Sequence, residues 1–161
     1  MPIKTIRRLA LIAAVPAIML GLLVVATPAS AALVPWQTLQ IDIVKWTNHQ
    51  RAKHGCRKVV VDNRLIRAAR DHSAWMARNA KFSHTGYRGT SFATRIRRAD
   101  FGRPLSENIA YGYSTGAAVV NAWMKSSGHR RNMLNCRARS VGVGAVYNHN
   151  GRAYYTQDFG Y

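Results

Sequence analysis

The end of the chain constrains its fold most, because residues 139–161 have the pattern of a β-hairpin. Two segments, RSVGVGAVYN at 139–148 and RAYYTQDFGY at 152–161, alternate along their length as strands do. Between them, residues 147–151 read Tyr-Asn-His-Asn-Gly, a composition that favours a tight turn. We therefore expect two antiparallel strands at the end of the chain, against which the earlier residues must pack.

Helical periodicity dominates the residues before this hairpin. Apolar side chains recur at helical spacing in four segments: 35–55, 63–80, 91–102 and 116–128. Asp62 or Asn63 can cap the second of these helices, and Ser114 or Thr115 the fourth. Composition assigns three more segments: a strand in 56–62, an irregular connection in 103–113, and a turn or short helix in 129–136. This order of elements predicts an α+β fold in which helices cover an antiparallel sheet.

The first two helices have distinct apolar faces. On the first helix, the side chains expected near one face are Leu39, Ile43, Trp46 and Gln50. On the second helix, the expected apolar face holds Leu65, Ile66, Ala69, Ser73, Met76 and Ala80. His72 lies beside this second face, so we expect it to be a packed histidine with its hydrogen bonds satisfied.

Residues 1–31 have the three parts of a secretory signal peptide. A basic start, MPIKTIRR, precedes the apolar run LALIAAVPAIMLGLLVVA, and TPASAA places small residues at Ala29 and Ala31. An uncleaved anchor is the alternative, because a run of this length is near the lower limit for spanning a bilayer. The A-x-A site, and the proline and glycine within the run, favour cleavage after Ala31. We therefore expect one secreted domain, residues 32–161, without a stable transmembrane anchor.

The mature chain is strongly basic. Three of the 24 lysines and arginines lie in the signal segment, so 21 remain against six acidic residues, a formal charge of +15. Such a charge favours polyanionic partners, such as anionic cell-wall polymers or lipid headgroups. The arginines considered for this role are Arg95, Arg97, Arg98, Arg130, Arg131, Arg137 and Arg139. A solvated basic surface is the alternative, and specific nucleic-acid binding is not expected because no recognition module is present.

The two cysteines, Cys56 and Cys136, both lie in the mature chain. An even number of cysteines in an exported protein predicts a disulfide, here closing a loop of about 80 residues. A metal site that uses Cys56 with the nearby His54 is the weaker alternative, because no second ligand stands at a suitable spacing from Cys136.

The segment GYSTG, residues 112–116, matches the G-x-S-x-G pattern of a nucleophilic serine. That motif requires a strand before it, a helix after it, and then an acid followed by a histidine. Here His129 and His149 precede Asp158, so the order is reversed. We therefore expect Ser114 to take part in helix capping and not in catalysis.

Glu107 is the only glutamate in the chain, and it lies between polar residues in the expected irregular connection. His84 and His129 lie in segments rich in glycine and serine, which suggests loops, where functional side chains often occur. Two imidazoles and one carboxylate can bind zinc or a similar divalent ion. Alternatively, the carboxylate can orient one of the histidines. Spacing alone does not show whether the three side chains converge.

Six blocks, in this order, resemble the CAP superfamily of SCP-like extracellular proteins, which includes cysteine-rich secretory, antigen 5 and pathogenesis-related proteins. The blocks are NHQRAKHGC, DNRLIRAARDHSAWMARNAKFSHTG, SENIAYGY, VVNAWMKSSGHRRNML, VGVGAV and YYTQDFG. The resemblance spans residues 36–161 and is closest to the bacterial secreted branch. It implies a three-layer α-β-α sandwich with a central antiparallel sheet.

The resemblance also implies a central cleft lined by two histidines and two glutamates, in which the histidines can hold a divalent metal such as zinc. His84, Glu107 and His129 match three of these positions, and the second glutamate would fall near Ser126. Its absence removes one negative charge from the cleft. Bacterial relatives often carry a cysteine pair, which Cys56 and Cys136 match.

Two functions follow from this resemblance. The first is a secreted binding module, not a classical enzyme, that binds a lipid, a cell-wall polymer or a protein in the cleft of His84, Glu107, Ser126 and His129. The second is a metal-dependent extracellular hydrolase in which Glu107 is a metal ligand or general base. Glu107 is the single candidate for a catalytic role, and His84 and His129 are the candidate metal ligands.

Overall fold

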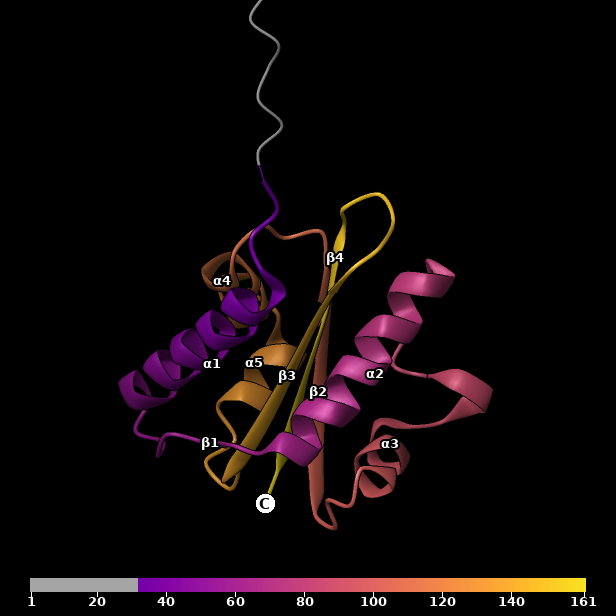
Figure 1. The fold of residues 1–161 in the computed structure, drawn as a ribbon. Helices are drawn as coiled ribbons and strands as arrows, with labels where there is room; N and C mark the ends of the chain where they lie inside the picture. Colours follow the sequence, from indigo (N-terminus) through magenta and orange to yellow (C-terminus); the bar gives the residue numbers. More distant parts are fainter. Residues whose placement is uncertain (1–31) are drawn as a thin grey trace, which may run out of the picture. The chain divides into compact units, whose positions relative to one another are not determined.

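The computed structural model describes residues 32–161, so the expected signal segment and its cleavage site lie outside the described residues. Helices lie on both sides of a four-stranded sheet (Figure 1). The elements are α1 (Trp36–Lys53), β1 (Val60–Val61), α2 (Asn63–Asn79), the 3₁₀ helix η1 (Tyr87–Gly89), α3 (Phe92–Arg98), β2 (Pro104–Tyr111), α4 (Gly116–Lys125), α5 (Ser127–Met133), β3 (Ser140–Tyr147) and β4 (Ala153–Gly160). The predicted α+β fold with helices on either face of the sheet is confirmed.

The terminal hairpin is the centre of the sheet. Strands β3 and β4 pair antiparallel from Ser140 opposite Gly160 to Tyr147 opposite Ala153, as the alternating pattern predicted. The strand order is β1-β3-β4-β2, with β2 antiparallel to β4 and the short β1 parallel to β3. The central sheet is therefore antiparallel except for its two-residue edge strand, which is shorter than the predicted strand.

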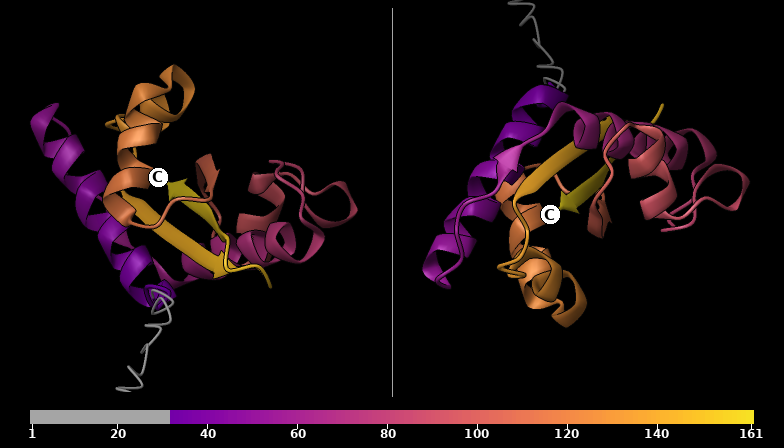
Figure 2. Two further views of the ribbon diagram at one scale, coloured as in Figure 1. Left: turned by 90° about the horizontal axis from the view of Figure 1, so that it is seen from above. Right: turned by 90° about the horizontal axis from the view of Figure 1, so that it is seen from below.

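The two faces of the sheet carry different helices. Strand β3 alternates between glycine, which faces one set of helices, and larger residues, which face the other. Val141 and Val143 join the main apolar core with α1, α4 and α5. Gly142 and Gly144 face α2, whose backbone lies against them. Helix α2 lies on the other side of the sheet from α1 (Figure 2). A Cβ atom on Gly144 would lie 2.4 Å from the carbonyl carbon of Ala69, so only glycine permits this approach.

Two helix caps agree with the sequence. The Asp62 side chain accepts a hydrogen bond from the Arg64 amide at the start of α2. At the start of α4 the cap is Thr115, whose hydroxyl accepts from the Ala118 amide, and Ser114 lies just outside the helix. The expectation that Ser114 caps this helix is therefore wrong, because Thr115 is the cap and Ser114 is an exposed residue that precedes it.

The last turn of α1 carries a buried cation that periodicity did not identify. The buried face of α1 holds Thr47 and Arg51, whereas Trp46 and Gln50 are only partly buried. Arg51 is fully buried and donates hydrogen bonds to four carbonyls, those of Arg57, Met133, Asn135 and Ala138. These bonds satisfy the guanidinium and join α1 to the chain after α5.

The predicted disulfide between Cys56 and Cys136 is present and lies beside this cation. It joins the loop after α1 to the segment after α5, across a sequence separation of 80 residues. The covalent bond and the Arg51 hydrogen bonds therefore hold α5 close to the end of α1.

Candidate functional site

The candidate site is built around Glu107, which lies in strand β2. The prediction of an irregular segment for residues 103–113 is wrong, since β2 covers Pro104–Tyr111 and pairs with β4. The polar sequence Ser-Glu-Asn has low strand propensity, and the pairing with β4 outweighs this local preference. Glu107 is directly opposite Asp158 and points towards α2, whereas Asn108 turns to the other face and contacts Gln157.

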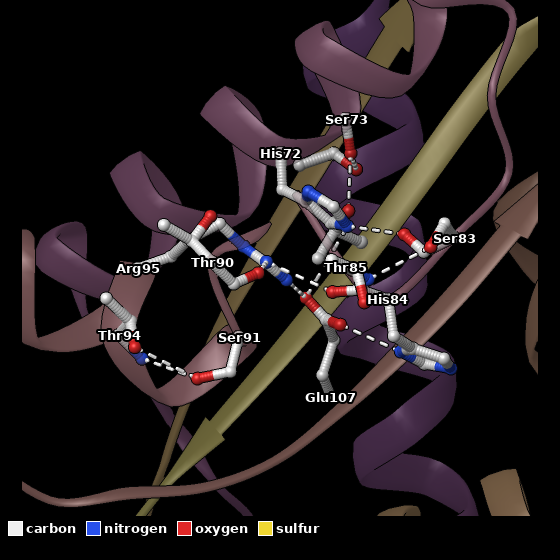
Figure 3. A network of polar contacts seen from close by, with 12 residues as sticks. His72, Ser73, Ser83, His84, Thr85, Thr90, Ser91, Thr94, Arg95 and Glu107 are labelled. Carbon is white, nitrogen blue, oxygen red and sulfur yellow. Dashed lines mark hydrogen bonds and ion pairs between the residues drawn. The ribbon is translucent and has the colours of Figure 1, made fainter. Parts of the chain in front are cut away.

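Both carboxylate oxygens of Glu107 have partners (Figure 3). Its Oε1 atom accepts a hydrogen bond from Nδ1 of His84 at 2.8 Å, and its Oε2 atom accepts from Nη2 of Arg95. The Nε2 atom of His72 lies 4.0 Å from Oε2. The Glu107 side chain is only 1% exposed, so the charge is compensated almost entirely by these protein groups.

Among the polar partners of Glu107, His84 is the one exposed to solvent. It lies in the loop between α2 and η1, as predicted, and its side chain is 55% exposed. Because a carboxylate only accepts hydrogen bonds, the contact with Glu107 places a proton on Nδ1 of the neutral imidazole. The Nε2 atom then carries the lone pair and is the atom that can accept a proton or bind a metal.

Arg95 links the loop that holds His84 to the Glu107 carboxylate through hydrogen bonds. Its Nη1 atom donates to the carbonyls of His84, at 3.1 Å, and Thr90, at 2.8 Å, while its Nη2 atom reaches Glu107. The side chain is only 10% exposed. Arg95 was considered for polyanion binding, with a solvated basic surface as the alternative, and both interpretations are wrong for this residue because it forms a buried ion pair with Glu107.

His72 is buried beneath the same carboxylate. Its Nε2 atom is 2.9 Å from the Ser83 carbonyl, as expected for a packed histidine, but its Nδ1 atom has no hydrogen-bond partner among residues 32–161. Burial lowers the pKa of His72 to about 4, and the positive charge of Arg95 contributes, against an opposing effect of Glu107. His72 is therefore neutral at physiological pH and packs on Trp75 with ring centroids 5.7 Å apart.

Asp158 is the second carboxyl group of this pocket. It is fully buried, and neither carboxyl oxygen has a hydrogen-bond partner within the described part of the chain. Burial raises the pKa of Asp158 well above its usual value, the Glu107 carboxylate raises it further, and Arg95 opposes the shift in part. A protonated carboxyl at this position avoids placing two negative charges side by side in the pocket.

His129 occupies a different part of the site from the one predicted. It lies in helix α5 rather than in a loop, and none of the polar contacts of the Glu107 side chain within residues 32–161 involves it. Burial lowers the pKa of His129, with a further contribution from the charge of His84. Asn132 holds α5 against β2 by donating to the Glu107 carbonyl at 3.0 Å and to the Asn108 side chain at 2.9 Å.

The four predicted cleft residues are thus only partly brought together. His84 and Glu107 are in direct contact, whereas His129 and Ser126 line an adjacent groove that extends along α4. Among residues 32–161, no three histidine, cysteine, aspartate or glutamate side chains are grouped so that they could hold a metal ion. The Glu107 carboxylate is instead paired with the Arg95 guanidinium.

Sequence reasoning missed Asp158, gave Arg95 a different role, and did not place His72 beside Glu107. A signal existed for Asp158, since Tyr154, Thr156 and Asp158 share one face of a strand in a pattern otherwise free of charge. Arg95 had no comparable signal, because it belongs to a helix with other arginines and only tertiary packing distinguishes it from them.

Comparison with known proteins places these residues in a family. Residues 44–159 match the family model CAP, the cysteine-rich secretory protein family. Two Bacillus subtilis proteins, the uncharacterized membrane protein YlbC and the protein YkwD, are each 36% identical to this chain, over 138 and 105 residues. These matches cover 82% and 65% of this chain, but only 38% and 41% of the relatives, so the chain spans about two fifths of their length.

Solved structures agree with this assignment. An extracellular SCP-domain protein from Bacillus anthracis has a TM-score of 0.70 and 33% identity, and the match covers 81% of this chain and 45% of that protein. An outer surface protein of Borrelia burgdorferi shares the fold, with a TM-score of 0.68 and 24% identity over 73% of this chain and 88% of that protein. The chain therefore belongs to the CAP family of cysteine-rich secretory proteins.

Proposed function

We propose that this CAP protein is a secreted binding module whose cleft presents His84 and His129 to a ligand. The observation that carries this proposal is the state of Glu107, whose carboxylate is buried and engaged on both oxygens. A general base must reach the proton that it removes. Glu107 instead accepts hydrogen bonds from His84 and Arg95. These contacts fit a residue that orients His84 better than they fit a general base.

Export is part of this proposal. The signal pattern of residues 1–31 supports it, as do the descriptions of two structural relatives as an extracellular protein and an outer surface protein. In residues 32–161, no helix has the length and apolar character needed to cross a membrane. Sequencing the N-terminus of the secreted protein should give Ala32 as its first residue, and retention of residues 1–31 would contradict cleavage.

A divalent metal would fit the two imidazoles. Nε2 of His84 and the ring of His129 would bind it, and zinc in particular accepts imidazole nitrogen. The Glu107 carboxylate would orient His84 through Nδ1, as carboxylates do for many metal-bound histidines. When bound, such an ion supplies positive charge that can hold an anionic or carbonyl group of the ligand.

Metal titration tests this role for the histidines. We would strip the protein of metal and titrate it with zinc in a calorimeter, alongside His84→Ala, His129→Ala and the control His149→Ala, which alters an exposed histidine in the hairpin turn. Zinc binding should be lost in the first two variants and retained in the control. Equal zinc affinity in all four proteins would refute the two-histidine site.

The hydrolase alternative has its own readout. Glu107→Gln removes the negative charge but retains an oxygen that can accept from His84. Turnover of ester, peptide or glycoside reporter substrates that disappears in Glu107→Gln, while circular dichroism shows that the variant is still folded, would replace the binding module by the hydrolase. The binding proposal predicts no such turnover in the wild-type protein.

A further inference from the structure

An open groove of about 480 Å³ runs from His129 along α4 and the end of β2. Three aromatic side chains form its exposed wall: Phe82, Tyr111 and Tyr113, which are 47%, 43% and 38% exposed. Ser126 and His129 supply polar groups to the lining of the groove. Exposed aromatic rings beside a hollow are uncommon on a protein surface without a binding role.

The aromatic wall is held in place by its neighbours. The Phe82 and Tyr111 rings lie 4.8 Å apart, and Tyr111 stacks on the buried Tyr154 at 5.8 Å. The Tyr155 hydroxyl donates to the Tyr113 carbonyl at 2.5 Å, which fixes the start of the loop before α4. The Phe82 and Tyr111 rings are thus preorganised, so a ligand would not have to order them on binding.

The charge around the groove is positive. The Arg152 guanidinium lies 5.7 Å from the centre of the Tyr111 ring, and Lys81, next to Phe82, lies 5.9 Å from the Trp75 ring. Within residues 32–161, no acidic side chain lines the groove. Together with the basic excess of the chain, this arrangement complements an anionic ligand.

An extended peptide cannot join the sheet at this groove, although β2 is an edge strand. The outward carbonyl of Glu107 accepts a hydrogen bond from Asn132, and that of Ile109 accepts one from Nε1 of Trp123 at 3.0 Å. These side chains occupy the acceptors that strand addition would use. A ligand in the groove must therefore bind through side chains.

We propose that the groove binds an anionic glycan, with sugar rings packed against Phe82, Tyr111 and Tyr113 and acidic substituents near Arg152. A pyranose ring has an apolar C–H face that packs on aromatic rings and a rim of hydroxyls, which the tyrosine hydroxyls, Ser126 and His129 can bind. An acyl chain would form no hydrogen bonds with these polar groups. The inference rests on the proposed binding module and names its ligand class.

Calorimetric titration of the purified protein with four probes tests this inference. The probes are a hyaluronan hexasaccharide, the neutral chitohexaose, polyaspartate, and vesicles of phosphatidylcholine and phosphatidylglycerol. The hexasaccharide should bind about tenfold more tightly than chitohexaose or polyaspartate, because only it combines sugar rings with charge. Failure of the hexasaccharide to bind, tighter binding of polyaspartate, or displacement of the hexasaccharide by vesicles would overturn the glycan assignment.

Variants locate the binding. Phe82→Ala and Tyr111→Ala should each weaken hexasaccharide binding by about tenfold, whereas Tyr87→Ala, an exposed tyrosine outside the groove lining, should not. Phe82 lies in a loop after α2, so its removal leaves the fold intact even if Tyr111→Ala does not. Unchanged binding in Phe82→Ala would refute the groove. If His84→Ala abolished binding while Phe82→Ala did not, the result would support the proposed binding module and refute the aromatic subsite.

Discussion

Glu107 and Asp158 lie directly opposite each other on β2 and β4, so two carboxyl groups share one buried pocket on the α2 face of the sheet. Arg95 donates to Glu107, and Asp158 has no hydrogen-bond partner within residues 32–161. The two carboxyl groups thus differ in their surroundings, and this difference assigns the charge to Glu107 and the proton to Asp158.

Replacing Asp158 by asparagine should stabilise the protein at alkaline pH. The pKa of Asp158 is raised in the fold, so the folded state keeps a proton that the unfolded chain loses above its ordinary pKa of 3.8. Between pH 3.8 and the raised pKa of Asp158 in the fold, the free energy of unfolding therefore falls as the pH rises. Asparagine does not titrate, so Asp158→Asn removes this decrease. Unfolding temperatures at about pH 3.5 and pH 8 measure it, with Asp71→Asn, at an exposed acid, as the control. If the unfolding temperature of Asp158→Asn dropped more towards high pH than that of the wild type, this result would contradict the protonated state of Asp158.

His72 should make the protein less stable as the pH falls. Its folded pKa of about 4 lies below the ordinary value of 6.5, so the unfolded chain binds a proton that the folded state excludes between these values. The stability present above pH 6.5 is lost towards pH 4, by roughly 3 kcal/mol. His72→Gln should flatten the dependence of the unfolding free energy on pH, whereas His149→Gln, on the surface, should leave the wild-type slope unchanged.

Arg95→Met should be far more destabilising than the same substitution at Arg97. Both residues lie in α3, but Arg95 pairs with buried Glu107, whereas Arg97 is exposed. Removing one partner of a buried ion pair typically costs about 3–5 kcal/mol, whereas a surface change costs about 0.5 kcal/mol or less. Urea unfolding of the two variants measures the difference, and equal midpoints would show that the ion pair contributes nothing.

Gly144→Ala should disturb the packing of α2 on the sheet. The added methyl group would lie 2.4 Å from the Ala69 backbone, which cannot move without displacing the helix. We expect a loss of about 1–3 kcal/mol or more, together with a weaker contact between α2 and the hairpin. Gly102→Ala is the matched control, because no atom lies within 4 Å of its added methyl group. Equal unfolding temperatures for the two variants would rule out this close approach.

Removal of the Cys56–Cys136 disulfide should destabilise the fold while Arg51 keeps the two ends of the loop together. For a closed loop of this length, the chain-entropy model gives a loss of about 4.5 kcal/mol. Denaturant unfolding of the Cys56→Ala/Cys136→Ala variant, compared with the oxidised and reduced wild type, tests the value. A loss below about 1 kcal/mol would mean that the reduced unfolded chain is already compact.

Local patterns predicted much of the architecture. The alternation of residues 139–161 predicted the hairpin, and helical periodicity with the Asp62 cap predicted α2. Both signals arise from residues close together in the chain, whose side-chain period follows directly from helix or strand geometry. Strand β2 was missed because its pairing with β4 is a long-range contact that the polar sequence around Glu107 does not encode locally.

The sequence by itself determined the fold class, the cysteine pair and the identity of Glu107 and His84 as residues of interest. Only the tertiary structure decided what surrounds them: it placed Arg95, His72 and Asp158 around Glu107 and moved His129 to a neighbouring helix. The physical reason is that burial and charge compensation depend on which elements pack together. An arginine on an isolated amphipathic helix is a surface charge, whereas the same arginine packed over a buried carboxylate becomes its counterion.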